Sequence, residues 1–157
     1  MIDFLNNDLG DILKRTKVIS ESVVWFQAFD PTLKKKILDW IRNDQLQKGI
    51  NDEEKIIGLY SELTEIINPE KVAGTPYTLK DTGDFYKSLF IDVLNNSFEV
   101  DGDGDKTEAT EYEFDVVNLF ELHGDGIVGL TEKNKVKLSE ELTLKYINYA
   151  KSILRIN

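Results

Sequence analysis

The sequence predicts a single α+β domain over residues 1–157, with helices at both ends and a small antiparallel β-sheet between them. Near both ends, apolar residues recur every three or four positions, which is the spacing of an amphipathic helix. In the middle, short apolar runs flank Asn95 and Asn96, and this pair favours a hairpin turn because asparagine accepts a positive φ. Apolar residues make up 41% of the chain, enough for a globular domain with a buried core.

Residues 1–42 are expected to be helical. The apolar repeat at residues 2–26 predicts one long amphipathic helix. Asp30 and Pro31 have the chemistry of an N-cap and a first helical position, so a second helix is expected from there to about Arg42. Its buried face would contain Leu33, Ile37, Trp40 and Ile41.

Residues 43–77 are expected to be rich in loops, because glycine and proline interrupt an apolar pattern that would otherwise suit a helix. A short helix is expected near residues 61–67. Residues 78–130 are expected to hold the β-hairpin core, with strands at 89–94 and 97–100.

Residues 107–114 alternate weakly and carry several glutamates, which suits a third, exposed strand. Asp115 can cap a short helix that Gly124 ends, and Thr131 can cap a C-terminal helix at residues 131–157. The apolar face of that last helix is expected to include Val136, Leu142, Tyr146, Tyr149, Ala150 and Ile153.

The net charge of −10 comes from one segment. Residues 92–125 contain 11 acids and a single base, Lys106, whereas the rest of the chain carries 18 acids and 18 bases. Such a surface repels the nucleic acid backbone, so it suits either a basic protein partner or a passage through which DNA slides without binding. A solvated acidic face is the plainer interpretation. The acids singled out as facing a channel or a partner are Asp101, Asp103, Asp105, Glu108, Glu111 and Glu113.

The sequence DGDGD, residues 101–105, resembles a calcium-binding loop because its aspartates alternate. An EF-hand frame that starts at Asp101 places Lys106 where glycine is required and Tyr112 where a closing carboxylate is required. A frame that starts at Glu99 also lacks the closing carboxylate. We therefore expect a surface turn at the tip of a hairpin, and an irregular, weak calcium site is the alternative. The candidate ligands of such a site would be Asp101, Asp103 and Asp105.

The sequence does not indicate catalysis or a bound cofactor. It contains no cysteine, and His123 is its only histidine, without a second histidine for a metal site or a recognisable nucleophile motif. A lone histidine at a helix end is usually a surface or capping residue. The chain opens without a basic region and apolar run, and no stretch approaches the roughly 18 apolar residues of a membrane span, so a soluble intracellular protein is expected.

Residues 44–154 resemble a known family through a series of short motifs. The matching positions follow one another in order: Gly58, Tyr60, Ser61 and Thr64, then a basic residue at Lys71, then Leu79, Thr82, Gly83, Phe85, Ser88 and Leu89, then Phe120, His123 and Gly126, and finally Gly129 and Thr131 in VGLTEKN. In this order and spacing the chain is similar to the virion-morphogenesis proteins of tailed bacteriophages, a group of tail-completion and head-to-tail joining proteins. It departs from them in GDGIVGL, which lacks their proline and arginine.

The resemblance implies that the chain is a structural protein of the phage neck and that it is made in the host cytoplasm. It also implies that the chain is not an enzyme. Such a protein would form a homo-oligomeric ring that joins the portal to neck or tail proteins and lets DNA pass without specific binding. The motif residues themselves would have structural roles. Two other classes stay open: an acidic inhibitor that mimics DNA, and a weak calcium-binding module.

Overall fold

The computed structural model describes residues 25, 27–95, 97–109 and 114–155. Its helices and strands give the α+β class that the sequence predicts. The long helix expected at residues 2–26 lies outside the described residues apart from Trp25. In the described part of the chain, each helix is too short or too polar to cross a membrane.

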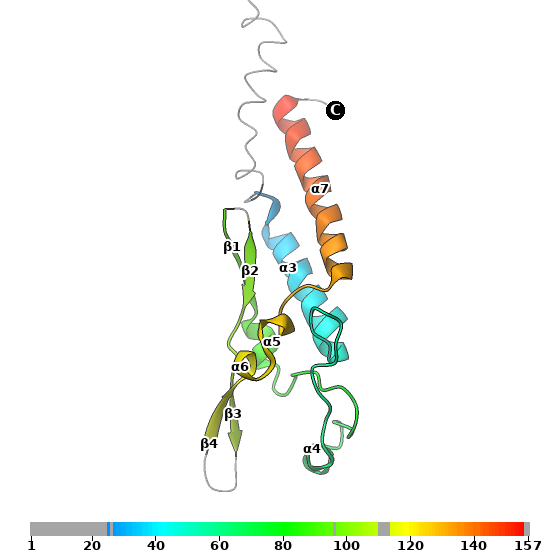
Figure 1. The fold of residues 1–157 in the computed structure, drawn as a ribbon. Coiled ribbons are helices and arrows are strands. Elements are labelled where there is room, and N and C mark those ends of the chain that lie inside the picture. Colours follow the sequence, from blue (N-terminus) through cyan, green and yellow to red (C-terminus); the bar gives the residue numbers. More distant parts are fainter. Residues whose placement is uncertain (1–24, 26, 96, 110–113, 156–157) are drawn as a thin grey trace, which may run out of the picture.

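The core forms around one helix, α3 (Pro31–Asp39), which lies between a hairpin and the C-terminal helix α7 (Glu132–Leu154) in Figure 1. The hairpin consists of β1 (Phe90–Val93) and β2 (Phe98–Asp101), which pair antiparallel with Val93 opposite Phe98. This is the hairpin predicted around Asn95 and Asn96. Burial of the shared apolar faces stabilises the arrangement by about 1.5–3 kcal/mol per fully buried aliphatic side chain. The buried residues include Leu33, Ile37, Ile41, Leu46, Ile91 and Leu138.

The second helix begins as predicted and ends later than predicted. Asp30 caps α3 by accepting a 2.8 Å hydrogen bond from the Leu33 backbone N–H, and Pro31 occupies the first turn. The helix does not stop at Arg42. It continues through a π-helical turn, η1 (Trp40–Gln45), and a 3₁₀ turn, η2 (Leu46–Lys48), to Gly49. No glycine or proline precedes Gly49 in this stretch, and its left-handed φ of 66° supplies the stop. Trp40, expected in the core, is only partly buried.

Gln45 connects the π-helical turn to the start of α7. Its side chain is fully buried, and its Nε2 donates to the Gly129 carbonyl at 2.7 Å. Its Oε1 accepts hydrogen bonds from the Thr131 backbone N–H at 3.2 Å and from Asn134 Nδ2 at 2.8 Å. A buried amide is tolerated in a core when its donors and acceptor are satisfied in this way.

Helix α7 is capped by Thr131 as predicted, because its side chain accepts from the Asn134 backbone N–H. The predicted apolar face is wrong in part: Val136 and Tyr146 are exposed, whereas Asn134 and Leu138 are buried. The face against α3 is partly polar, and charged side chains on α7 reach back to α3 and η1. These ion pairs are Lys36–Glu141 at 2.5 Å, Lys137–Asp44 at 2.6 Å, and Lys145–Asp30.

The rest of the middle segment differs from the prediction of one small sheet. Within the described residues, β3 (Asp105–Ala109) and β4 (Phe114–Asn118) form a second, separate two-stranded sheet. The third strand expected at residues 107–114 therefore covers parts of both. Asp115 does not cap a helix, because it lies inside β4 opposite Glu108.

The helix after β4 is capped by a different residue. Asn118 is the N-cap of α6 (Leu119–His123), and its side chain accepts from the Phe120 and Glu121 backbone N–H groups at 2.9 and 3.1 Å. Two valines at positions 116–117 prolong the strand, and asparagine caps a helix as well as aspartate does. The other helical elements are α4 (Glu62–Ile67), α5 (Asp84–Ser88) and the 3₁₀ turn η3 (Asp125–Ile127).

Replacing Gln45 by alanine should lower the free energy of unfolding by about 2–4 kcal/mol, because it leaves a part-buried carbonyl and two buried N–H donors without their partner. Urea denaturation followed by circular dichroism measures this change. Gln47→Ala is the matched control, since Gln47 is exposed and its amide bonds only to the neighbouring Asn43. Equal stabilities of the two variants would contradict the role assigned to Gln45.

Candidate functional site

The first group of motif residues meets at a small cavity between the two segments that flank α4 and helix α6. The cavity has a volume of about 240 Å³ and is bounded by Tyr60 before α4, by Tyr77 after α4 and by His123 at the end of α6. Two backbone hydrogen bonds join the segment before α4 to the segment after it. The Tyr60 N–H donates to the Thr75 carbonyl and the Tyr77 N–H donates to the Gly58 carbonyl, each at 3.0 Å. The remaining lining residues are Thr64, Lys71, Leu79, Lys80, Asp81, Lys106, Val117, Leu119 and Leu122.

Gly58 is required here because the Tyr77 ring lies against its backbone. A Cβ atom at Gly58 would stand 2.2 Å from Tyr77 Cε1, far inside van der Waals contact. The ring is thereby directed at His123, where the Tyr77 hydroxyl oxygen lies 3.2 Å from Nδ1 and 3.1 Å from Nε2. Tyr60 packs on the other side of Tyr77, with ring centroids 5.8 Å apart.

The electrostatics of this cluster favour neutral side chains. Burial raises the pKa of Tyr77, and the nearby Tyr60 adds to the effect. Burial lowers the pKa of His123 below its usual 6.5. A phenol that must act as a base or nucleophile needs a lowered pKa, so the Tyr77–His123 pair has the properties of a packing contact.

A salt bridge forms part of the cavity lining. Lys71, the basic position of the motif, pairs with Asp81 at 2.8 Å, and this contact lowers the pKa of the Asp81 carboxyl. The Lys71 ammonium also lies 5.9 Å from the centroid of the Tyr60 ring. Thr64 stands at the cavity on α4, whose N-cap Ser61 bonds to it through both the Thr64 backbone N–H and its hydroxyl.

The second group of motif residues forms the turn into β1. Gly83 is the N-cap of α5 with φ at 84°, a conformation that favours glycine, and the Thr82 hydroxyl accepts from the Asp84 backbone N–H at 3.3 Å. Phe85 is buried edge-on against Phe120, with centroids 5.9 Å apart. These residues build a helix-to-strand corner.

DGDGD is a close-packed link and not the tip of a hairpin. It joins β2 to β3, which belong to different sheets. A Cβ at Gly102 would stand 2.9 Å from Leu89 Cδ2, and a Cβ at Gly104 would stand 2.6 Å from the Phe120 ring. The motif serine Ser88 accepts a 2.9 Å hydrogen bond from the Asp103 backbone N–H. The glycines therefore let the link lie directly on α5 and α6.

The aspartates of DGDGD bond locally. Asp101 Oδ1 accepts from the Gly102 N–H, Asp103 Oδ1 from the Asp105 N–H, and Asp105 Oδ1 from Asn118 Nδ2. Among the described residues, no group of three or more His, Cys, Asp or Glu side chains is placed to hold a metal ion. Of the other acids singled out in the sequence, Glu108 lies in β3, whereas Glu111 and Glu113 fall outside the described residues.

Gly129, the last motif glycine, also marks a close contact. A Cβ there would stand 2.6 Å from Asp52 Oδ2, and one at Gly126 would stand 2.6 Å from Asp52 Oδ1. The Asp52 backbone N–H donates to the Gly126 carbonyl at 2.9 Å. The loop after η2 is thus held against the segment that leads into α7.

The sequence did not predict how much aliphatic surface α4 and its flanks expose. Helix α4 has no buried residue, and Ile66 and Ile67 are each 77% exposed. We call the exposed side chains of this segment the α4 surface, and they are Ile56, Leu59, Leu63, Ile66, Ile67 and Val72. Periodicity predicts a helix but does not say which neighbour, if any, covers it. Exposed aliphatic groups of this kind are typical of interaction surfaces.

No protein-family model, curated protein or solved structure matches the chain.

The single histidine allows a direct test of the Tyr77–His123 cluster. We expect the His123 C2 proton to titrate below pH 6.5 in an NMR experiment, because burial disfavours the charged ring. The unfolded chain then binds the proton more tightly than the folded chain. The stability contributed by the neutral ring is therefore complete above about pH 6.5 and is lost as the pH falls through the lower pKa of the folded chain. A midpoint at or above 6.5 would contradict the buried placement.

Gly58→Ala should move that midpoint up toward 6.5, because the new methyl group displaces the Tyr77 ring that covers His123. Tyr77→Phe keeps the ring and should keep the pKa low. Gly74→Ala is the control: its Cβ meets nothing within 4 Å and its φ of 78° strains the backbone, so stability should fall without a change in the His123 pKa. Circular dichroism confirms that each variant is folded.

Proposed function

We propose that the chain is a structural protein of a tailed-phage neck, a head-to-tail joining or tail-completion protein that acts as a homo-oligomeric ring around the DNA channel. The observation that carries the proposal is the convergence of motif residues from distant parts of the sequence. Gly58 and Tyr60 meet His123 through Tyr77, and the corner that contains Phe85 and Ser88 packs on Phe120 and DGDGD. Motif positions that matched only by chance would not be expected to contact one another in the fold.

The α4 surface supports an assembled protein over a catalytic one. Burying an aliphatic side chain contributes about 1.5–3 kcal/mol, so a monomer that leaves several exposed forgoes a large stabilisation. In a ring, each subunit presents one surface to the next and receives a different surface in return. The α4 surface is our candidate for one of these two surfaces.

The acidic segment supports the proposed position around DNA. The acids of the β1–β2 hairpin and of DGDGD are exposed, as a channel wall or the surface for a basic partner requires. The DNA-mimic alternative requires carboxylates spaced along an extended face. Here Asp101 and Asp103 bond to backbone N–H groups within two residues, and Asp105 bonds to Asn118 at the end of β4, which disfavours it.

The purified full-length chain should form rings of uniform size, visible by electron microscopy and by light scattering coupled to gel filtration. It should also bind portal-containing phage heads that lack tails. A chain that stays monomeric at high concentration and does not bind such heads would contradict the proposal. Salt-sensitive binding to a basic nuclease, without rings, would favour the DNA-mimic class instead.

Ile66→Asp should abolish ring formation and leave the subunit folded, because Ile66 is 77% exposed and makes little contribution to the core. The matched control is Leu144→Asp, which places the same charge at an exposed leucine of α7, 59% exposed. Light scattering gives the assembly state and circular dichroism gives the fold. Normal rings from the Ile66 variant would remove the α4 surface from the interface.

A further inference from the structure

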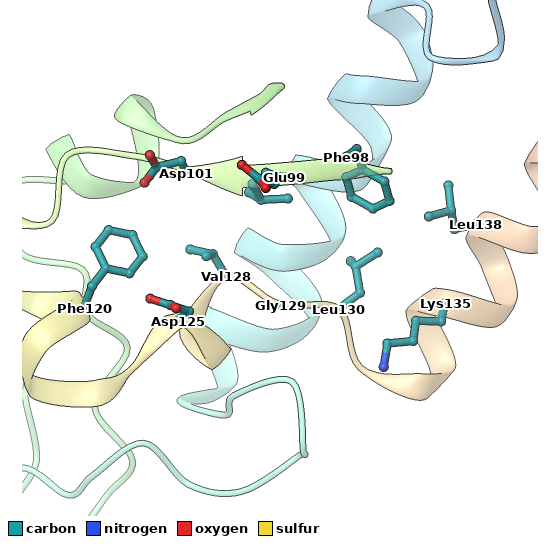
Figure 2. Close-up of a pocket in the computed structure, with 11 residues that line it drawn as sticks. Phe98, Glu99, Asp101, Phe120, Asp125, Val128, Gly129, Leu130, Lys135 and Leu138 are labelled. Atoms are coloured by element: carbon teal, nitrogen blue, oxygen red, sulfur yellow. The ribbon is translucent and has the colours of Figure 1, made fainter. Parts of the chain in front are cut away.

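A groove of about 740 Å³ runs along β2, within the range of about 300–1,000 Å³ that ligand sites occupy. Figure 2 shows β2 as one wall and the segment Val128–Leu130 as the other, with α6 and the start of α7 at the two ends. All four residues of β2 line the groove and none of β1 does. The lining residues are Phe98, Glu99, Val100, Asp101, Phe120, Asp125, Val128, Gly129, Leu130, Lys135 and Leu138.

The edge of β2 that borders this groove is open. Among the described strands β2 pairs only with β1. The Leu94 N–H donates to the Ser97 carbonyl at 2.8 Å, so Leu94 and Ser97 form a hydrogen-bonded pair. This pair determines which of the next pairs along β1 and β2 are hydrogen-bonded and which are not. Because hydrogen-bonded and non-hydrogen-bonded pairs alternate, Phe98 and Val100 direct their backbone N–H and C=O groups away from β1. These groups are available to a further strand.

The two faces of β2 differ, and they determine what that strand must look like. Phe98 and Val100 pack on the core, with the Phe98 ring centroid 5.0 Å from that of Phe29. Glu99 and Asp101 are exposed on the opposite face, and Glu99 stands directly opposite Asp92 of β1. Like charges opposite one another are unfavourable, so a neighbouring cation would be stabilising. Side chains of an added strand alternate between the same two faces.

The charge of the groove excludes an acidic occupant. Its lining holds Glu99, Asp101 and Asp125 against a single base, Lys135, which is already paired with Glu132 at 2.6 Å. The chain's own second hairpin, residues 105–118, carries five acids and one base, so a second copy of it would bring like charges together.

We propose that this groove binds an extended segment of a different protein, whose residues alternate between apolar and basic, as an added strand on β2. The apolar side chains enter the groove beside Phe98 and Val100, and the basic side chains face Glu99 and Asp101. The inference rests on the open edge and the charge of the groove, and it stands whether or not the protein belongs to a phage neck.

A synthetic eight-residue peptide that alternates lysine and valine tests the proposal, with binding to the full chain followed by fluorescence anisotropy at low and high salt. Three control peptides are needed. One has the same composition with the lysines and valines in separate blocks, one alternates glutamate and valine, and one alternates lysine and valine but is N-methylated on the edge that faces β2. We expect the alternating lysine peptide to bind at least tenfold more tightly than each control, and more weakly as salt rises.

Variants of the full chain locate the site. Glu99→Lys and Asp101→Lys together should weaken binding by tenfold or more, and both positions are exposed, so the fold should be retained. Glu140→Lys with Glu70→Lys makes the same change of charge at exposed positions on α7 and in the loop after α4, and it should leave the affinity unchanged. Equal binding of the block peptide, or an affinity that the Glu99 and Asp101 substitutions leave unchanged, would overturn the proposal.

Discussion

The arrangement of the described chain depends on one buried side chain, the amide of Gln45. It satisfies the Gly129 carbonyl, the Thr131 N–H and the Asn134 amide at once, and the π-helical turn at the end of α3 places it there. These contacts fix the path of the segment before α7, which is also the wall of the groove opposite β2. A buried amide is costly unless it is satisfied, so this network also disfavours other packings of α7.

Glycine at points of close contact is the second constraint on the described chain. Gly58 accepts the Tyr77 ring, Gly104 accepts Phe120, and Gly129 accepts Asp52. In each case a loop lies so close to another element that a Cβ atom would collide with it. These glycines thus mark contacts between segments that are distant in the sequence.

Much of the fold could be predicted from the sequence wherever the signal is local. Helix caps are set within three or four residues, and the hairpin at Asn95 and Asn96 has its own turn residues. The second hairpin was missed because residues 110–113, between its two strands, contain no glycine, proline or asparagine. Gln45 was missed because its partners lie 84–89 residues away, and the α4 surface because periodicity carries no information on burial by other elements. The caps that were predicted correctly are Asp30 and Thr131.

The two exposed surfaces have different chemistry, and this difference bears on how the protein would assemble. The α4 surface is aliphatic, with Glu62 and Glu65 in the first turn of its helix, and the groove along β2 is lined by apolar side chains together with Glu99, Asp101 and Asp125. An isologous contact would bring either set of acids against its own copy, which is unfavourable once water is excluded. Both surfaces therefore favour a contact with an unlike surface. A ring built head to tail satisfies that requirement for the α4 surface, and a basic strand from another protein satisfies it for the groove.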